Sequence, residues 1–98
     1  MSGYIIAQVK VHDPEEYEKY RSGFMDALQP FDGRILVATD SAEVLEGEWP
    51  QIRTVVLEFP SGDLAVAWYK SKQYQEIAQY RFLAARTNMI LVNGYSLQ

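Results

Sequence analysis

An α+β fold, with the element order strand, helix, strand, strand, helix, strand, is predicted by three features of the sequence. Apolar and polar residues alternate along several short segments, which is typical of strands with one buried face. Between these segments, apolar residues recur three and four positions apart, which indicates amphipathic helices. Proline, glycine, serine and aspartate stand at the junctions, where they favour helix starts and turns.

The first strand is predicted at residues 4–11 (YIIAQVKV), because apolar side chains occupy every second position. One face of this strand holds Ile5, Ala7, Val9 and Val11. The opposite face holds Tyr4, Ile6, Gln8 and Lys10. We therefore expect the first face to pack in the core, whereas the second face is only half apolar.

The first helix is expected to begin after Asp13, whose side chain is suited to accept a hydrogen bond from a free amide of the first turn. Pro14 fits the first helical position, and the acidic residues 15–16 favour the positive end of a helix. Pro30 ends the helix, and residues 32–33 (DG) make a turn. One stripe of this helix carries Tyr17, Tyr20, Arg21, Phe24 and Leu28.

A hairpin is predicted next. Residues 34–38 (RILVA) begin the second strand, and residues 43–47 (EVLEG) resume the extended pattern after an interruption at residues 40–41. We therefore expect one long strand with a break or a bulge. The chain turns at residues 49–50 (WP), and residues 52–59 return as the third strand.

The second helical region has two candidate starts, Ser61 and Ser71, each followed by apolar residues at helical spacing. We expect either one kinked helix or two helices in succession. Residues 88–92 (NMILV) form the last predicted strand, which ends at residues 93–94 (NG).

Right-handed crossovers then give an antiparallel sheet with the helices on one face, which is the ferredoxin-like βαββαβ arrangement. The other face of the sheet has no cover from its own chain. It is half apolar and carries Tyr4, Ile6, Gln8, Val56 and Glu58. Because a bare apolar sheet face is unfavourable in water, we expect a second copy of the chain to cover it and form a homodimer.

The composition limits the domain organisation and the partners. Ninety-eight residues suit a single domain, expected to span residues 1–98, and 48% of them are hydrophobic. The net charge is −4 and the basic residues are scattered, so neither nucleic acid nor an anionic membrane is an expected partner. Cysteine is absent, which removes disulfides and thiolate chemistry. The sequence contains no pattern of a secretory signal or a membrane span, so we expect a cytoplasmic protein.

A set of motifs runs in order along nearly the whole chain: DPEEY at 13–17 with Tyr20, GR at 33–34, EVLEG at 43–47 with Trp49, VVLEFPS at 55–61, AWY at 67–69, Ser71 with YQ at 74–75, and Arg81 with AAR at 84–86. As a set they resemble domain-of-unknown-function family 1330, in the dimeric α/β-barrel superfamily. The resemblance implies a ferredoxin-like domain that pairs into a dimeric α/β barrel. That superfamily includes cofactor-free monooxygenases, lactone isomerases and haem-degrading enzymes, which is an analogy at the level of the fold.

A ligand site is predicted where the helices face the sheet. Arg81 follows Tyr74 by seven positions and Ile77 by four, so its guanidinium points with the apolar stripe of its helix. Arg34 begins a strand beside the turn that follows the first helix. We expect Arg34 and Arg81 to bind a small anionic or carbonyl-bearing molecule, because arginine holds a carboxylate through two parallel hydrogen bonds. The walls of this site would be Tyr17, Tyr20 and Trp68.

Each candidate residue also has a structural interpretation. Arg81 can instead form an internal ion pair with Glu46 or Glu58, and the aromatic stripes can simply be core. His12 is the only histidine, and it is either a general base with the adjacent aspartate or a surface residue at a junction. No metal and no other cofactor is expected, because one histidine, scattered carboxylates and no cysteine make a poor ligand set.

Three function classes therefore stay open. The first is a cofactor-independent enzyme that acts on a small molecule. The second is a ligand-binding or sensing module, and the third is a structural dimer. A water-filled cavity that ends at Arg34, Arg81 and tyrosine hydroxyls would favour the first two classes. A fully packed interior would favour the third.

Overall fold

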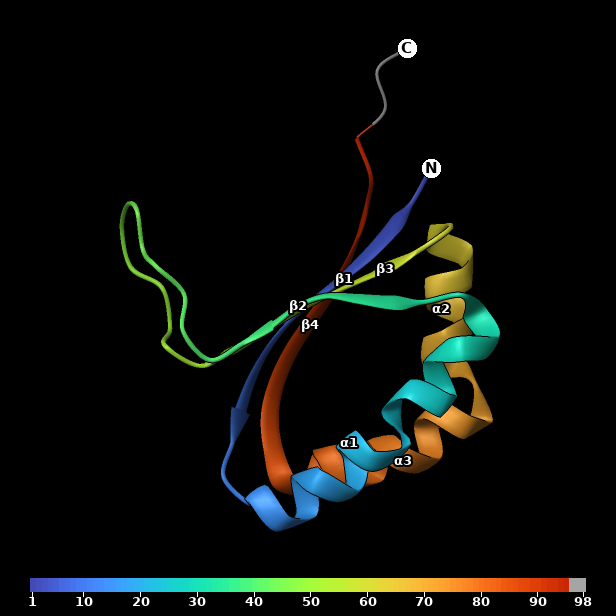
Figure 1. Ribbon diagram of the computed structural model, residues 1–98, viewed down its shortest axis with the longest axis horizontal. Helices are drawn as coiled ribbons and strands as arrows, with labels where there is room; N and C mark the ends of the chain where they lie inside the picture. The colour runs from blue at the N-terminus through green and yellow to red at the C-terminus, as the bar shows by residue number, and fades with distance from the viewer. Residues whose placement is uncertain (96–98) are drawn as a thin grey trace.

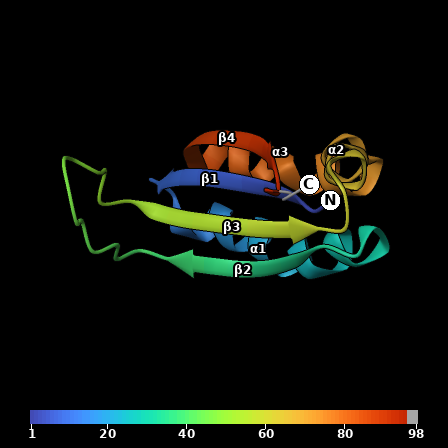
Figure 2. The same ribbon diagram turned by 90° about the horizontal axis from the view of Figure 1, so that it is seen from above.

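The computed structural model describes residues 1–95. The elements are β1 (Gly3–Val11), α1 (Pro14–Leu28), a short 3-10 helix (Gln29–Phe31), β2 (Arg34–Thr39), β3 (Arg53–Phe59), α2 (Gly62–Lys70), α3 (Lys72–Ala84) and β4 (Ala85–Asn93). The four strands form one antiparallel sheet in the order β2-β3-β1-β4, and they lie side by side in Figure 2. The helices cover one face of this sheet (Figure 1). The predicted α+β, ferredoxin-like arrangement is confirmed.

The helix starts lie where the sequence predicts them. Asp13 Oδ1 accepts a hydrogen bond from the backbone amide of Glu16 at 3.3 Å. The hydroxyls of Ser61 and Ser71 each accept from the amide three residues ahead, at 3.1 and 3.2 Å. The second helical region is therefore two helices in succession, and Ser71 both ends α2 and caps α3. Within residues 1–95, none of the helices has the length and apolar character needed to cross a bilayer.

The prediction that residues 43–47 continue the second strand is wrong. β2 ends at Thr39, which lies opposite Thr54 near the start of β3, so the residues beyond it have no strand to pair with. Residues 40–52 instead form an irregular segment, the arm, that projects from the sheet (Figure 1). Within the arm, Gly47 has a φ of 72°, a left-handed conformation that glycine adopts without strain.

The last strand is longer than predicted. It begins at Ala85 rather than near residue 88, because α3 ends at Ala84 and Ala85 already has extended backbone angles. All 9 residues of β4 pair with β1. As a result β1 is hydrogen-bonded along both of its edges, to β3 and to β4.

The core fills the space between the helices and the inner face of the sheet. Its largest fully buried side chains include Trp68, Tyr74 and Phe59. Gly23 allows α1 to approach α3 closely, since a Cβ atom at this position would lie 2.9 Å from Cγ2 of Ile77. This close approach holds the aromatic residues of α1 against those of α3.

The first prediction concerns the start of α1. Replacing Asp13 with Ala removes the only side-chain acceptor seen on the amides of this first turn among residues 1–95, so we expect the free energy of unfolding to fall by about 0.5–2 kcal/mol. Urea denaturation followed by circular dichroism measures this change. Asp13→Asn keeps an acceptor oxygen and should recover most of the loss. An unchanged unfolding midpoint in Asp13→Ala would show that the bond does not stabilise the helix.

Candidate functional site

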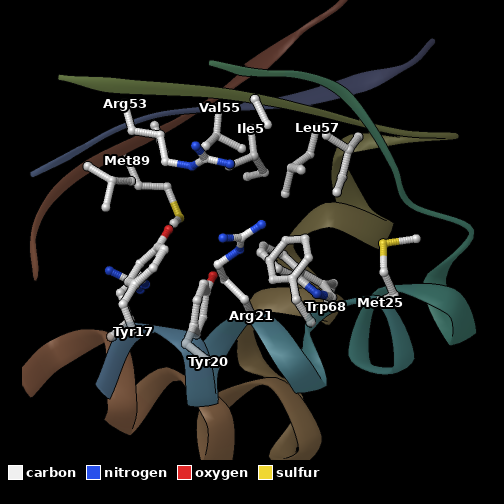
Figure 3. Close-up of a pocket in the computed structure, with 16 residues that line it drawn as sticks. Ile5, Tyr17, Tyr20, Arg21, Met25, Arg53, Val55, Leu57, Trp68 and Met89 are labelled. Atoms are coloured by element: carbon white, nitrogen blue, oxygen red, sulfur yellow. The ribbon is translucent and has the colours of Figure 1, made fainter. Parts of the chain in front are cut away.

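A cavity of about 280 Å³ lies between α1 and the inner face of the sheet, and Arg81 of α3 also lines it (Figure 3). Its position follows from the size of the strand residues. Ala7, Val55 and Ala38 lie next to one another across β1, β3 and β2, and all three line the cavity. Because interiors are otherwise closely packed, a row of short side chains beneath a helix leaves unfilled space.

Arg81 is the buried cation of this cavity, with 5% of its surface exposed. One guanidinium nitrogen, Nη2, donates to the hydroxyl of Tyr74 at 3.3 Å, and the hydroxyls of Tyr74 and Tyr20 are hydrogen-bonded at 2.9 Å. The guanidinium carbon lies 5.6 Å from the ring centre of Tyr20 and 5.0 Å from that of Phe82. Ring faces and hydroxyl groups therefore hold this charge in place.

No carboxylate within residues 1–95 pairs with Arg81, and its Nε atom is buried without a hydrogen-bond partner. The alternative interpretation, an internal ion pair with Glu46 or Glu58, is therefore not what the structure shows. Glu58 is bonded to Arg34, and Glu46 lies exposed on the arm. The indole nitrogen of Trp68, which also lines the cavity, is likewise buried without an acceptor. The cavity thus contains buried donors that lack acceptors.

Two further arginines, Arg21 of α1 and Arg53 of β3, line the same cavity (Figure 3). Their carboxylate partners come from outside the lining. Arg53 Nη1 lies 3.4 Å from Asp40 Oδ1, and Arg21 Nη1 lies 3.6 Å from Glu18 Oε2. None of the 16 lining residues is acidic. The cavity is therefore positively charged in a protein whose net charge is −4.

The tyrosines of the cavity are hydrogen-bond donors rather than bases. Burial raises the pKa of Tyr17, although the nearby arginines oppose this rise. Burial also raises the pKa of Tyr20 well above its usual value, and the hydroxyl of Tyr74 adds to the effect. Both side chains therefore keep their protons at neutral pH and present O–H groups.

Arg34 lies outside this cavity, on the outer face of the sheet. In the pairing of β2 with β3, Arg34 lies opposite Glu58, whose side chain points away from the helices. Arg34 Nε donates a hydrogen bond to Glu58 Oε1 at 2.7 Å. The hydroxyl of Tyr4 donates to the other carboxylate oxygen at 2.8 Å. The structure brings together the other predicted site residues, which are Arg81, Tyr17, Tyr20 and Trp68.

Arg53 is a charged lining residue that was not predicted from the sequence as part of the site. It lies two residues before Val55 on β3, and alternate residues of a strand share a face. The alternation of β3 therefore indicates that Arg53 faces the helices. Arg21, which the helical stripe of α1 includes, does line the cavity. His12 is exposed where β1 meets α1, and it is not among the lining residues. Residues 1–95 contain no group of three or more side chains placed to hold a metal ion.

The contact between Arg34, Glu58 and Tyr4 predicts that stability depends on pH. Hydrogen bonds from Tyr4 and Arg34 lower the pKa of Glu58 below its usual value of 4.5. Because the folded-state pKa is the lower one, the contact stabilises the fold above pH 4.5 and loses this effect as the pH falls through the folded-state pKa.

We therefore expect the natural protein to be more stable than Glu58→Gln at neutral pH, and the difference to shrink in acid. Thermal unfolding at a series of pH values measures this difference. A difference in stability between the two proteins that stays constant with pH would contradict a role for the carboxylate charge.

Solved structures share this fold at low sequence identity. RPA0582, a protein of unknown function from Rhodopseudomonas palustris, is 16% identical with a TM-score of 0.78, over 98% of this chain and 84% of that one. SnoaB, a cofactor-independent oxygenase from Streptomyces nogalater, is 12% identical with a TM-score of 0.67, over 98% and 95% of the two chains. An uncharacterized NIPSNAP domain protein from Burkholderia xenovorans is 8% identical with a TM-score of 0.60, over 100% and 98%. No curated protein matches the sequence.

These neighbours share the ferredoxin-like fold of this chain. Identities this low show a shared fold and do not transfer an activity. The family described as a domain of unknown function (DUF1330) matches residues 2–95, which is nearly the whole chain. The motifs that resemble this family and the topology of the sheet agree with that match. The protein therefore belongs to the DUF1330 family.

Proposed function

We propose that this protein works as a homodimer that binds a small anionic or carbonyl-bearing organic molecule in the cavity between α1, α3 and the sheet. One observation carries the binding proposal. The guanidinium of Arg81 is 5% exposed, lines the cavity, and has no carboxylate partner within residues 1–95. A buried cation without a counter-charge is unfavourable, so a ligand oxygen that accepts from it would stabilise the site.

Five of the lining residues have a defined role in this proposal. Arg81 binds the anionic or carbonyl oxygen, and Arg53 takes the role that was predicted for Arg34 from the sequence. The hydroxyls of Tyr17 and Tyr20 donate to a second oxygen, since both keep their protons at neutral pH. The aromatic wall beneath the ligand includes Trp68, which lines the cavity.

Catalysis without a cofactor is the second candidate for the same cavity. SnoaB, which has the same fold, is described as a cofactor-independent oxygenase. Arginine and tyrosine donors around a ligand carbonyl would stabilise an enolate. However, none of the 16 lining residues is a histidine, aspartate, glutamate or cysteine, so a proton would have to pass to water or to the ligand itself. The lining therefore supports binding more directly than turnover, and a ligand-sensing or structural dimer is the other alternative.

The binding proposal predicts a specific loss in Arg81→Met. In a thermal-shift screen of small organic acids, an acid present at about 100 times its Kd should stabilise the natural protein by about 2.7 kcal/mol. Arg81→Met should lose this stabilisation because the ligand oxygen has no cation to accept from. Arg81→Lys should also lose most of it, because an ammonium group cannot reproduce the two-pronged geometry.

Arg34→Met is the matched control, because it removes an arginine that lies outside the cavity. This variant should keep the ligand-induced stabilisation. Retained stabilisation in a folded Arg81→Met protein, or its loss in Arg34→Met alone, would contradict the proposed site.

The outer face of the sheet supports the homodimer. Ile6 lies between Val56 and Ile90 in the register of the three strands, and Ile90 is 56% exposed. Exposed apolar side chains also stand on the arm, where Leu45 is 87% and Trp49 45% exposed. Exposed apolar side chains of this kind favour association, and a second copy of the same sheet face is the simplest cover.

The dimer proposal predicts that Ile90→Lys yields a monomer. The position is exposed in one copy, so the added charge is tolerated there, but it would be buried between two copies. Sedimentation velocity at micromolar concentration should show a dimer for the natural chain, with an interface on the order of 1,600 Å². Gln73→Lys, which adds the same charge on exposed α3, should remain dimeric. A monomeric natural chain at this concentration would exclude the dimer.

A further inference from the structure

We propose that the ligand of this cavity is an amphipathic monocarboxylate, with one anionic head and a compact apolar body. This inference rests on the proposed function, because it concerns the same cavity. The two ends of the cavity differ in chemistry: Figure 3 shows Tyr17 and Arg53 toward one end, and Leu57, Trp68 and Met25 toward the other. A ligand that fits both ends must itself have a polar and an apolar part.

The polar end of the cavity matches a ligand that carries a single negative charge. The arginines Arg81, Arg53 and Arg21 all lie close enough to the hydroxyl of Tyr17 to oppose the rise in its pKa. Arg53 and Arg21 already have carboxylate partners outside the lining, at 3.4 and 3.6 Å. Arg81 has none within residues 1–95, so one cationic charge remains uncompensated. One carboxylate matches this balance better than a phosphate or a dicarboxylate.

The apolar end offers almost nothing to a polar body. Leu57 and Trp68 are fully buried there, and Phe24 packs against the ring of Trp68 with 6.0 Å between the ring centres. Met25 and Ile35, which are 58% and 41% exposed, mark where the cavity meets solvent between α1 and the edge strand β2. Among residues 1–95 the one unpaired buried side-chain polar atom at this end is the indole nitrogen of Trp68, so a charged or strongly polar group placed here would lose its water for at most one hydrogen bond.

The cavity volume limits the size of the apolar body. At about 280 Å³, the cavity lies just below the usual range of about 300–1,000 Å³ for small-molecule sites. A single ring or a short alkyl chain fits this space better than a fused-ring system. Phenylacetate is therefore a suitable probe, because it joins one carboxylate to one ring.

Titration calorimetry on the full chain tests the inference with phenylacetate, phenylacetamide, acetate and inorganic phosphate. We expect phenylacetate to bind at least about tenfold more tightly than each of the other three, because only it satisfies both ends of the cavity. If acetate or phosphate binds as tightly as phenylacetate, the amphipathic class is wrong while anion binding stands. If phenylacetamide binds as tightly, recognition of the negative charge is wrong and the monocarboxylate inference fails, while the proposed binding of a carbonyl-bearing molecule stands. Failure of phenylacetate to bind at millimolar concentration overturns the inference.

A pair of variants tests whether the apolar part of the ligand lies against Met25. Met25→Asn lies at the exposed rim, so the fold should tolerate it, and it should weaken phenylacetate binding several-fold while leaving acetate binding unchanged. Leu83→Asn is the matched control, because Leu83 is 68% exposed on α3 and does not line the cavity. Equal effects of the two variants on phenylacetate binding would show that the apolar body does not lie against Met25.

Discussion

The pairing of β1 along both of its edges is the constraint on which the rest of the structure depends. Since β3 and β4 hold it from either side, its side chains must alternate strictly between the helices and the outer face. A shift of one residue would bury Lys10 and expose Ile5 and Val9, so the register is strongly determined. The short side chain of Ala7 then falls under α1, where it leaves part of the cavity, while Ile6 falls on the uncovered face.

Arg81 is buried without an acidic partner among residues 1–95, which leaves a positive charge in the interior. An internal ion pair would have neutralised the charge and left the cavity apolar. Here the charge lies between ring faces and tyrosine hydroxyls, an arrangement made possible by the close packing of α1 on α3 at Gly23. The charge of Arg81 therefore faces the cavity without a carboxylate partner among residues 1–95.

The structural neighbours of this chain show how widely one fold is used. At identities of 16%, 12% and 8%, the three neighbours keep the topology while their descriptions range from unknown function to a cofactor-independent oxygenase. Function in such a group depends on the side chains that line the cavity rather than on the sheet and helices. In this chain those side chains combine three arginines, two tyrosines and an apolar end, with no residue in the lining that readily accepts a proton at neutral pH.

Local chemistry allowed the sequence alone to predict the order of the elements, the caps at Asp13, Ser61 and Ser71, and the two faces of β1. These features depend on residues close together in the chain, and so does the direction of Arg81 along its helical stripe. Features that depend on contacts between residues far apart in the chain were determined only by the tertiary structure. Residues 43–47 have a strand-like pattern but no strand beside them, and cross-strand register places Arg34 against Glu58. Whether the stripes pack fully or leave a cavity is likewise a tertiary property, because it depends on the combined volumes of side chains from separate elements.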